Sequence, residues 1–287
     1  MQFGYDQNVC EMTILAGVVV YMPEYNRLRE NITRVLEQVD KLIIVINGID
    51  SYEITKKCSK GHANIEFIVN NNNMGIAFAL KQIMEFAMTN DIDWVLSLDQ
   101  DSVIQPGLIN EYRNYIHLKN IGILTCNIKD RNFYEANGFK NNEDVREVDK
   151  CITAASLMSV EAYKSCSGYD ENMFIDGVDW DICFNLRRNG YSVYKINFDG
   201  LLQEVGKAKN VKLFKKNYVT YGHSPFRNYY QAKNNIFIAK KYPEYYTLTK
   251  AILVEWRTAL LILLYEDKKF AKLIKRTKGF LEGVLRR

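Results

Sequence analysis

Short apolar runs alternate with helical patterns along the first third of the chain. Residues are apolar at nearly every position of four runs, which predicts strands at Thr13–Tyr21, Lys41–Ile46, Ile65–Val69 and Asp93–Leu98. Two segments carry apolar residues at helical spacing, which predicts helices at Arg27–Val39 and Gly75–Met88. Strands that are apolar on both faces are typical of a mostly parallel sheet covered by helices on both faces, so we predict the α/β class with a Rossmann-like sheet.

The pattern continues through the rest of the chain with less regular spacing. It predicts helices at Pro106–Leu118 and Val178–Asn189, and strands at Gly122–Asn127, Ile152–Met158 and Tyr191–Ile196. The polar segment Asp130–Asp149 predicts a loop or an edge hairpin. Further on, Tyr229–Lys241 and Leu248–Tyr265 are helical in pattern, so we expect a C-terminal helical extension.

Charged residues divide the chain into an acidic body and a basic tail. The 287 residues carry a net charge of +4, but residues 1–206 hold 19 Lys and Arg against 29 Asp and Glu, whereas residues 207–287 hold 19 against 5. A basic tail is expected to meet an anionic partner such as nucleic acid, a membrane surface or a diphosphate. We place the boundary between a body at residues 1–225 and a basic helical extension at residues 226–287.

The tail helices are consistent with two arrangements. The uncharged stretch Thr258–Tyr265 is too short to span a bilayer, which needs about 20 apolar residues. An apolar helix followed by a basic amphipathic one is typical of an element that lies on a membrane surface. The alternative is a helical subdomain that packs on the sheet and exposes its basic face to solvent.

Composition excludes several classes of protein. The chain is 47% hydrophobic and 25% charged, as in a globular protein with a sizeable core. Its six cysteines are scattered and form no CxxC pair, which argues against a zinc site and a disulfide framework. Residues 1–12 lack the basic and apolar regions of a signal peptide, so we expect a cytoplasmic protein.

Asp99 and Asp101 stand at the end of the fourth predicted strand. Ligands of open parallel sheets bind beyond the carboxyl ends of the strands. Two neighbouring carboxylates repel each other unless a cation joins them, and Mg²⁺ and Mn²⁺ favour carboxylate oxygens and bridge to substrate phosphates. The alternative is a surface turn with two solvated acids, and the position at a strand end supports the metal site.

Three more acids, Asp176, Asp179 and Asp181, lie where a helix is predicted to begin. An acid at a helix N-terminus can serve simply as a cap. Three acids within six residues exceed what one cap needs. One of these carboxylates is therefore a candidate general base that takes a proton from an attacking hydroxyl.

A third candidate cluster lies in the segment Gly222–Tyr230, which precedes a predicted helix. His223 there is a candidate metal ligand or phosphate contact, and Arg227 and Lys233 are candidates to neutralise a diphosphate. The alternative for His223 is a loop histidine that hydrogen-bonds locally. His62 and His117 have no comparable context.

The order of these motifs resembles the family 2 glycosyltransferases of the GT-A fold. More narrowly, it resembles the bacterial rhamnosyltransferases that build capsule and cell-wall polysaccharides. The resemblance extends from Ala16 to Tyr242. Its motifs are Val19–Pro23, Gln38–Gly48, Asn73–Ala77, Asp93–Ser102, Phe174–Asp176, Val178–Asp179 and His223–Pro225.

The resemblance implies a role for each motif. The expected nucleotide-sugar-binding residues are Tyr21, Pro23, Asn47, Asn73, Gly75, Asp99 and Arg227. Asp101 and Asp99 are implied as ligands of Mg²⁺ or Mn²⁺, and Asp179 as the catalytic base. Trp180 and Asp176 are the expected acceptor-binding residues. Such enzymes invert, because the deprotonated acceptor hydroxyl attacks the anomeric carbon opposite the diphosphate, whose charge the metal stabilises.

Three positions depart from the family pattern. Ile46 stands where most members have an acid, and Val178 stands where most have Glu. The second departure is common among the rhamnosyltransferases and therefore favours that branch. Gln203 replaces a histidine of the branch, so the remaining metal ligand would be His223 or water.

The implied donor is dTDP-β-L-rhamnose, and the implied acceptor is a lipid-linked glycan at the inner membrane face. A peripheral position on that membrane would fit the basic tail. A UDP-galactose or UDP-glucose transferase is the alternative within the same fold. A nucleic-acid-binding protein is disfavoured, because no RRM, OB or helix-turn-helix signature appears. The sequence leaves open the acceptor, the linkage and whether the chain forms a homodimer.

Overall fold

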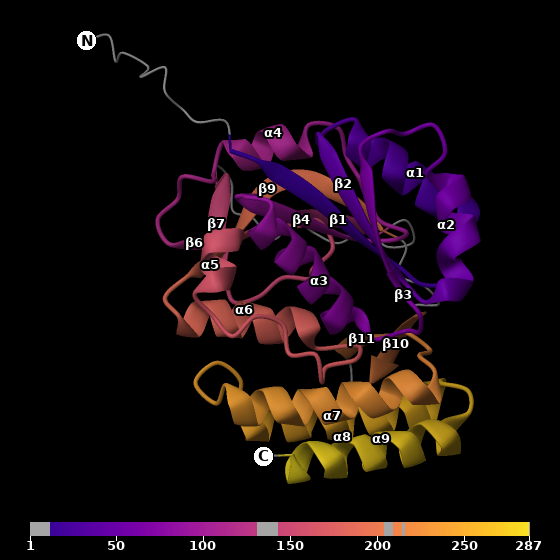
Figure 1. Ribbon diagram of the computed structural model, residues 1–287. Coiled ribbons are helices and arrows are strands. Elements are labelled where there is room, and N and C mark those ends of the chain that lie inside the picture. The colour runs from indigo at the N-terminus through magenta and orange to yellow at the C-terminus, as the bar shows by residue number, and fades with distance from the viewer. Residues whose placement is uncertain (1–11, 131–142, 204–208, 214–215, 287) are drawn as a thin grey trace.

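The computed structural model describes residues 12–130, 143–203, 209–213 and 216–286 (Figure 1). Four strands form its parallel half, namely β1 (Ile14–Val20), β2 (Lys41–Asn47), β3 (Ile65–Asn70) and β4 (Trp94–Asp99), in the order β3-β2-β1-β4. Val19 pairs with Val45 on one side and with Asp99 on the other. The carboxyl ends of β1, β2 and β4 therefore meet at one edge.

The second half of the sheet mixes parallel and antiparallel pairs. Its strands are β5 (Val103–Ile104), β6 (Ile121–Asp130), β7 (Val145–Val148), β8 (Ser156–Ser159) and β9 (Ser192–Gln203). They continue the sheet as β4-β8-β6-β9-β5, with β7 paired to β9. β8 runs antiparallel to β4, whereas β9 runs parallel to β6 and ends at Gln203.

Helices cover both faces of this sheet, as the alternation along β1 shows. Leu15 and Val19 belong to a buried cluster with residues of α3 (Ile76–Thr89), α5 (Val160–Lys164) and α6 (Val178–Arg188). Ala16 and Val18 point the other way, into a cluster with α1 (Tyr25–Leu36), α2 (Tyr52–Cys58) and α4 (Leu108–Arg113). A short 3₁₀ turn, η1 (Ile49–Ser51), precedes α2. The expected α/β class with two covered faces is confirmed.

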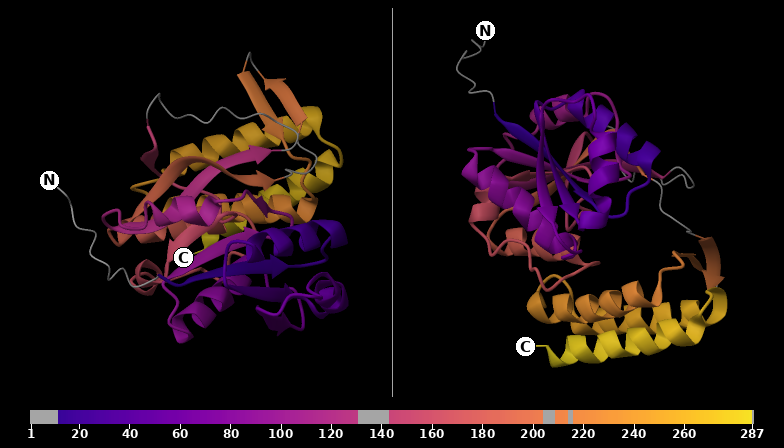
Figure 2. Two further views of the ribbon diagram at one scale, coloured as in Figure 1. Left: turned by 90° about the horizontal axis from the view of Figure 1, so that it is seen from above. Right: turned by 45° about the vertical axis from the view of Figure 1, so that its right-hand side comes forward.

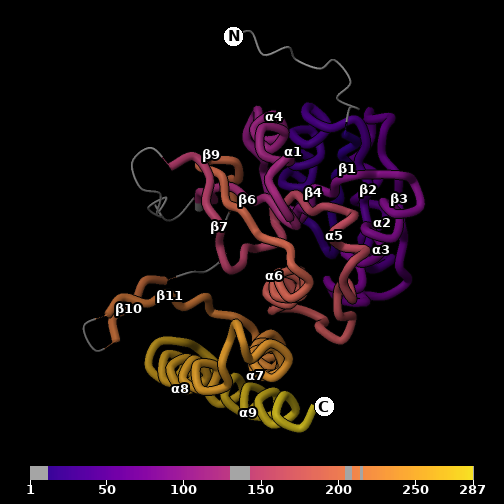
Figure 3. The backbone as a smooth tube through the Cα atoms, turned by 90° about the vertical axis from the view of Figure 1, so that its left-hand side faces the viewer, coloured from indigo at the N-terminus to yellow at the C-terminus, as the bar shows by residue number. Residues whose placement is uncertain are grey.

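Three helices form a separate layer next to the sheet body, as Figure 2 shows from two sides. They are α7 (Pro225–Lys241), α8 (Leu248–Tyr265) and α9 (Lys269–Leu285). α7 lies between α6 and the other two helices (Figure 3), and its Ile236 and Ile238 belong to the same buried cluster as the sheet. The hairpin β10 (Lys209–Leu213) and β11 (Lys216–Thr220) connects body and layer. The expected helical extension is thus confirmed, and it packs on the body.

Two glycines bring α9 into close contact with α7. A Cβ at Gly279 would lie 2.1 Å from the carbonyl oxygen of Tyr229, and one at Gly283 would lie 2.6 Å from that of Lys233. The Lys240 ammonium donates to the carbonyl oxygen of Val284, 2.6 Å away, near the C-terminal end of α9. Since residues four apart share a helix face, the two glycines form a flat strip on which the α7 backbone rests.

Local differences from the predicted elements have physical causes. The helix expected at Pro106–Leu118 is shorter, because the chain leaves α4 through three-residue turns such as Asn114 N–H to Glu111 O at 3.2 Å. The strand expected at Ile152–Met158 begins later, at Ser156, because Ala155 has a left-handed φ of 56°. β7 lies within the expected edge segment, and residues 131–142 of that segment lie outside the described ones.

Other elements were not predicted from the pattern. These are η1, α2, α5, β5, β10 and β11. All are seven residues or shorter, so their apolar period is too brief to detect. None of the helices in the described part of the chain combines the length and apolar composition that crossing a bilayer requires.

We expect Gly279→Ala to destabilise the protein by about 1–3 kcal/mol, because the added methyl group would force α9 away from the α7 backbone. The measurement is denaturant unfolding of the full chain. Thr277→Ala, at an exposed position of the same helix, is the control and should stay within about 0.5 kcal/mol of the parent. A Gly279→Ala protein as stable as the parent would contradict the close contact.

Candidate functional site

Asn47 organises the edge where β1, β2 and β4 end. It is buried, and its amide donates to Asn73 Oδ1 and to the Gly75 carbonyl, each at 3.1 Å. Its Oδ1 accepts from the Met74 N–H at 3.0 Å and from the Asn70 amide at 3.2 Å. This one side chain therefore holds the loop that follows β3. The expected pocket residues Asn47, Asn73 and Gly75 are brought together.

Gly75 places this loop directly against the segment before α6. Its φ is 89°, and a Cβ there would lie 2.7 Å from the Phe174 carbonyl oxygen. The next residue, Ile76, donates its N–H to that same oxygen at 2.8 Å. Only glycine combines this φ with so close an approach. The contact joins the nucleotide-type half of the chain to the segment that carries Asp176 and Asp179.

The turn after β1 forms the adjacent wall. The Tyr21 ring lies 3.3 Å from where a Cβ of Gly48 would stand, and the Tyr21 N–H donates to Gln100 Oε1 at 2.8 Å. Met22 has a left-handed φ of 46°, and its N–H donates to Ser51 Oγ at 2.7 Å. Pro23 is buried at the end of the turn. Tyr21, half exposed, is available at the surface of the site.

Asn31 holds the Asp99–Ser102 turn from the side of α1. It is fully buried, and its amide donates to the carbonyl oxygens of Asp99 at 2.7 Å and Ser102 at 2.6 Å. Sequence reasoning missed this residue. The available signal was a polar residue inside the apolar stripe of Leu28, Ile32 and Val35.

Asp99 is surrounded by other charges. Its pKa is raised to about 6, mainly by desolvation and less by the nearby carboxylates of Asp101 and Asp179. The Arg227 guanidinium opposes this shift, as does Gln203, whose amide donates to Asp99 Oδ2 at 3.3 Å. Asp101 is exposed at the turn. The structure thus brings residues from β4, α6, β9 and α7 to one place.

Asp179 lies in the first turn of α6, where its Oδ1 accepts the Trp180 N–H at 3.0 Å. Its pKa is raised to about 6, mainly by burial and less by the Asp176 charge, while the Trp180 N–H and the Lys150 ammonium oppose the shift. Lys150 lies over the Trp180 ring, and its own pKa is lowered to about 8 by burial. Tyr246 packs edge-on against the same ring at 5.5 Å. Lys150 is therefore a site residue that sequence reasoning missed.

Asp176 and Arg227 form a bidentate ion pair. Arg227 Nε lies 3.0 Å from Asp176 Oδ2, and Nη2 lies 2.9 Å from Oδ1. Asn234 of α7 donates to the carbonyl oxygens of Ile175 at 3.0 Å and of Asp176 at 2.7 Å. Asp176 has a left-handed φ of 65°, which these contacts hold in place. The ion pair therefore aims Arg227 from the helical layer into the site.

His223 lies on the α7 side of the site. Its ring stacks on Tyr221 with centroids 5.4 Å apart, and burial followed by the Arg227 charge lowers its pKa. Within the ranges that the structure describes, no group of three or more His, Cys, Asp or Glu side chains is arranged to hold a metal. The carboxylate of Asp101 is among the charges that shift the pKa of Asp99. The charges that shift the pKa of His223 most are those of Arg227 and Asp176.

Comparison with known proteins agrees with this geometry. Residues 18–158 match the family model described as Glycosyl transferase family 2. The dTDP-rhamnosyl transferase RfbF of Shigella flexneri is 25% identical over 242 residues, which cover 79% of this chain and 80% of RfbF. Among solved structures, S. aureus TarS 1-349 aligns with a TM-score of 0.63 at 12% identity, over 95% of this chain and 81% of TarS. GalNAc-T7 with UDP, GalNAc and Mn²⁺ aligns with a TM-score of 0.61 at 11% identity, over 98% of this chain and 57% of that protein.

A sheet of this order, with its polar cluster at the strand ends, is the GT-A fold, and the chain is a glycosyltransferase. Residues 18–158 match the family 2 glycosyltransferases, and the chain is similar to a dTDP-rhamnosyl transferase.

Asp99→Asn should raise the melting temperature of the metal-free protein at about pH 8 and have little effect at about pH 4. The folded-state pKa of Asp99 is raised from 3.8 to about 6, so its ionised form is disfavoured by folding. The folded protein therefore loses stability as the pH rises from 3.8 to about 6. Asparagine does not ionise, so the variant does not lose this stability. Thermal unfolding in EDTA at both pH values measures it.

The control is Asp267→Asn, an exposed carboxylate in the turn before α9. It should give the same small change at both pH values. Equal effects of Asp99→Asn at the two pH values would show that Asp99 is not crowded by other carboxylates.

Proposed function

We propose that the protein is an inverting rhamnosyltransferase with dTDP-β-L-rhamnose as donor. The observation that carries the proposal is that the carboxylates of Asp179 and Asp101 and the guanidinium of Arg227 lie close enough to Asp99 to shift its pKa. Such a site contains both a base and groups that can bind a diphosphate. The similarity to RfbF, a dTDP-rhamnosyl transferase, supports the donor.

Asp179 would act as the general base. With a pKa of about 6 it is largely ionised at neutral pH, yet basic enough to take a proton from an acceptor hydroxyl. The Lys150 charge favours its ionised form. The hydroxyl oxygen then attacks the anomeric carbon from the face opposite the diphosphate, which inverts the configuration. Arg227, held by Asp176, would stabilise the charge that develops on the leaving diphosphate.

Asp99 and Asp101 would hold a divalent cation, Mg²⁺ or Mn²⁺. The donor set fits these ions, because Mg²⁺ commonly binds one or two carboxylates together with substrate phosphates and water. The raised pKa of Asp99 supports the fit, since part of it comes from the Asp101 and Asp179 carboxylates. The similar fold of GalNAc-T7 was solved with Mn²⁺. When bound, the cation would supply charge stabilisation to the leaving diphosphate, and His223 or water would be its remaining ligand.

Tyr21, Pro23, Asn47, Asn73 and Gly75 would form the nucleotide pocket. Their support is their common position at the ends of β1 and β2 and in the loop after β3, where Asn47 connects them. The acceptor would approach from the side of Trp180 and Asp176. Because Asp176 is already paired with Arg227, we propose that its part is to orient that arginine and shape the acceptor side.

We propose that the acceptor is a lipid-linked glycan at the inner face of the cell membrane. The support is the position of the basic helical layer, whose α7 contributes Arg227 to the site. We also propose a division into a catalytic unit at residues 1–225 and an extension at residues 226–287 that contributes residues to the site. The extension supplies Arg227 and Asn234, so the two parts would work together.

Asp179→Asn should lower turnover of dTDP-rhamnose and acceptor by a factor of about 10²–10⁴, because the neutral amide cannot take the proton. Binding of dTDP should change little, since Asn has the same shape and contacts the Trp180 N–H. The measurements are dTDP release and calorimetric titration with dTDP and Mn²⁺. The control Asp267→Asn, outside the site, should have normal turnover. Near-normal turnover by Asp179→Asn would show that Asp179 is not the base.

A panel of dTDP, UDP and GDP sugars separates the proposed donor from the alternative, a UDP-galactose or UDP-glucose donor. We expect the dTDP sugar to give the largest thermal stabilisation in the presence of Mn²⁺. A ligand that binds only the folded state contributes about 2.7 kcal/mol at 100 times its Kd. A larger shift with a UDP-hexose would transfer the proposal to that donor while keeping the site.

A further inference from the structure

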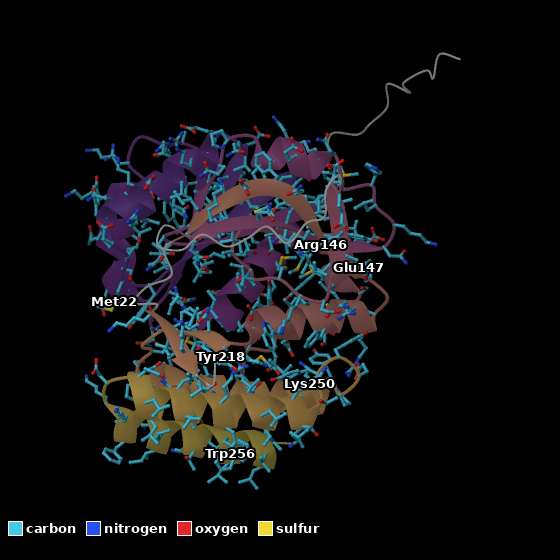
Figure 4. All side chains as sticks on the ribbon, turned by 180° about the vertical axis from the view of Figure 1, so that it is seen from behind. Met22, Arg146, Glu147, Tyr218, Lys250 and Trp256 are labelled. Atoms are coloured by element: carbon cyan, nitrogen blue, oxygen red, sulfur yellow. The ribbon has the colours of Figure 1, made fainter. Side chains whose placement is uncertain are left out.

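The outer side of the helical layer exposes large apolar side chains. Trp256 of α8 is 74% exposed and Phe270 of α9 is 80% exposed, and Figure 4 shows Trp256 on the side of the layer away from the sheet. The outer face consists of Leu253, Trp256, Leu263, Leu264, Phe270, Ile274, Leu281 and Leu285. In contrast, the side of α9 that contains Gly279 and Gly283 is buried against α7. α9 therefore has one side packed on α7 and a separate, exposed side that carries large apolar residues.

The spacing shows that this face is continuous along α9. Phe270, Ile274, Leu281 and Leu285 follow one another at four or seven residues, so they lie on one side of the helix. Monomeric proteins rarely expose contiguous apolar patches of this kind without a partner. A surface helix with one apolar side and many lysines is typical of helices that lie in a membrane interface.

The exposed charges of α8, α9 and the turn between them are mainly basic. Glu255 pairs with Arg276 at 2.8 Å, and Glu266 pairs with Lys272 at 2.7 Å, with all four side chains at most 10% exposed. These pairs bury two acids and two bases, so they leave the net charge of the surface unchanged. The exposed charges that remain are Lys250, Arg257, Lys268, Lys275 and Lys278 against Asp267, and the half-buried Glu282 pairs with Lys278 at 3.9 Å.

We propose that the outer face of α8 and α9 docks on an anionic lipid bilayer. Trp256 and Phe270 enter the boundary between headgroups and acyl chains, and Lys275 and Lys278 contact lipid phosphates. The inference deepens the proposed function, because it rests on an acceptor that is itself held in a membrane. α7 lies between this face and the site, so docking would hold Arg227 one helical layer above the membrane surface.

Charge favours a bilayer over a second copy of the chain. In a two-fold dimer the same surface meets itself, which would bring the basic rims of both copies together. Like charges in such a contact repel, whereas lipid phosphates neutralise them. Each lysine near an anionic surface adds a similar increment to binding.

The test is sedimentation of the full chain with vesicles of phosphatidylcholine alone and of phosphatidylcholine with an equal amount of phosphatidylglycerol. We expect the protein to bind strongly to the vesicles that contain phosphatidylglycerol and weakly to those of phosphatidylcholine alone. The double variant Lys275→Gln/Lys278→Gln should lower that partition by roughly 30-fold. The matched control is Lys60→Gln/Lys119→Gln, which removes the same charge from exposed positions of the sheet body and should bind as the parent does.

Tryptophan fluorescence reports insertion directly. Trp94 is 5% exposed and Trp180 lies under Lys150, so a blue shift on anionic vesicles comes from Trp256. The shift should be absent in Trp256→Phe, which keeps an apolar ring and should still bind. Trp256→Ser with Phe270→Ser should reduce partition as well.

Three outcomes would overturn the inference. They are no binding to anionic vesicles, equal loss in both lysine double variants, and a dimer in light scattering that Trp256→Ser/Phe270→Ser converts to monomer. Donor binding in solution is measured in parallel. If the protein binds dTDP but not anionic vesicles, only the docking face is rejected. If it binds anionic vesicles but not dTDP, only the proposed function is rejected.

Discussion

The constraint on which the site depends is the crowding of carboxylates at the ends of the strands. Asp99, Asp101 and Asp179 come from β4, the turn after it and α6, and desolvation together with their mutual repulsion raises the pKa of Asp99 to about 6. Such an arrangement is stable only if cations compensate it. Within the protein, Arg227 and Lys150 supply the positive charge, and neither comes from the four-stranded parallel half.

This requirement gives the helical layer a role in the site. Arg227 and Asn234 stand on one side of α7, where the first binds the Asp176 carboxylate and the second binds the backbone around it. The two glycines of α9 pack against the backbone of α7. Apolar residues of α7 belong to the core of the body. The layer is thus part of the folding unit of the site. Most of the exposed apolar residues and lysines of the layer lie on α8 and α9.

Much of the fold could be predicted because its elements are long and regular. The four parallel strands and α1, α3, α6, α7 and α8 lie within a few residues of their predicted ranges, since burial on both faces leaves a clear pattern. Asn47, Asn73, Gly75, Asp99 and Asp179 could be chosen as site residues from strand ends and from the family resemblance. Asn31 and Lys150 could not, because each stands alone in sequence and acts across a distance of many residues.

The sequence by itself determined the class of sheet, the edge at which the polar residues gather and the basic character of the tail. These features follow from local patterns, because the apolar runs of strands and the apolar spacing of helices involve residues that are close together in the sequence. Only the tertiary structure decided which charges meet. It paired Arg227 with Asp176, set Lys150 beside Asp179 and buried two glutamates against Arg276 and Lys272. Coulomb interactions and desolvation depend on distance and burial, which arise only when segments far apart in the chain pack together.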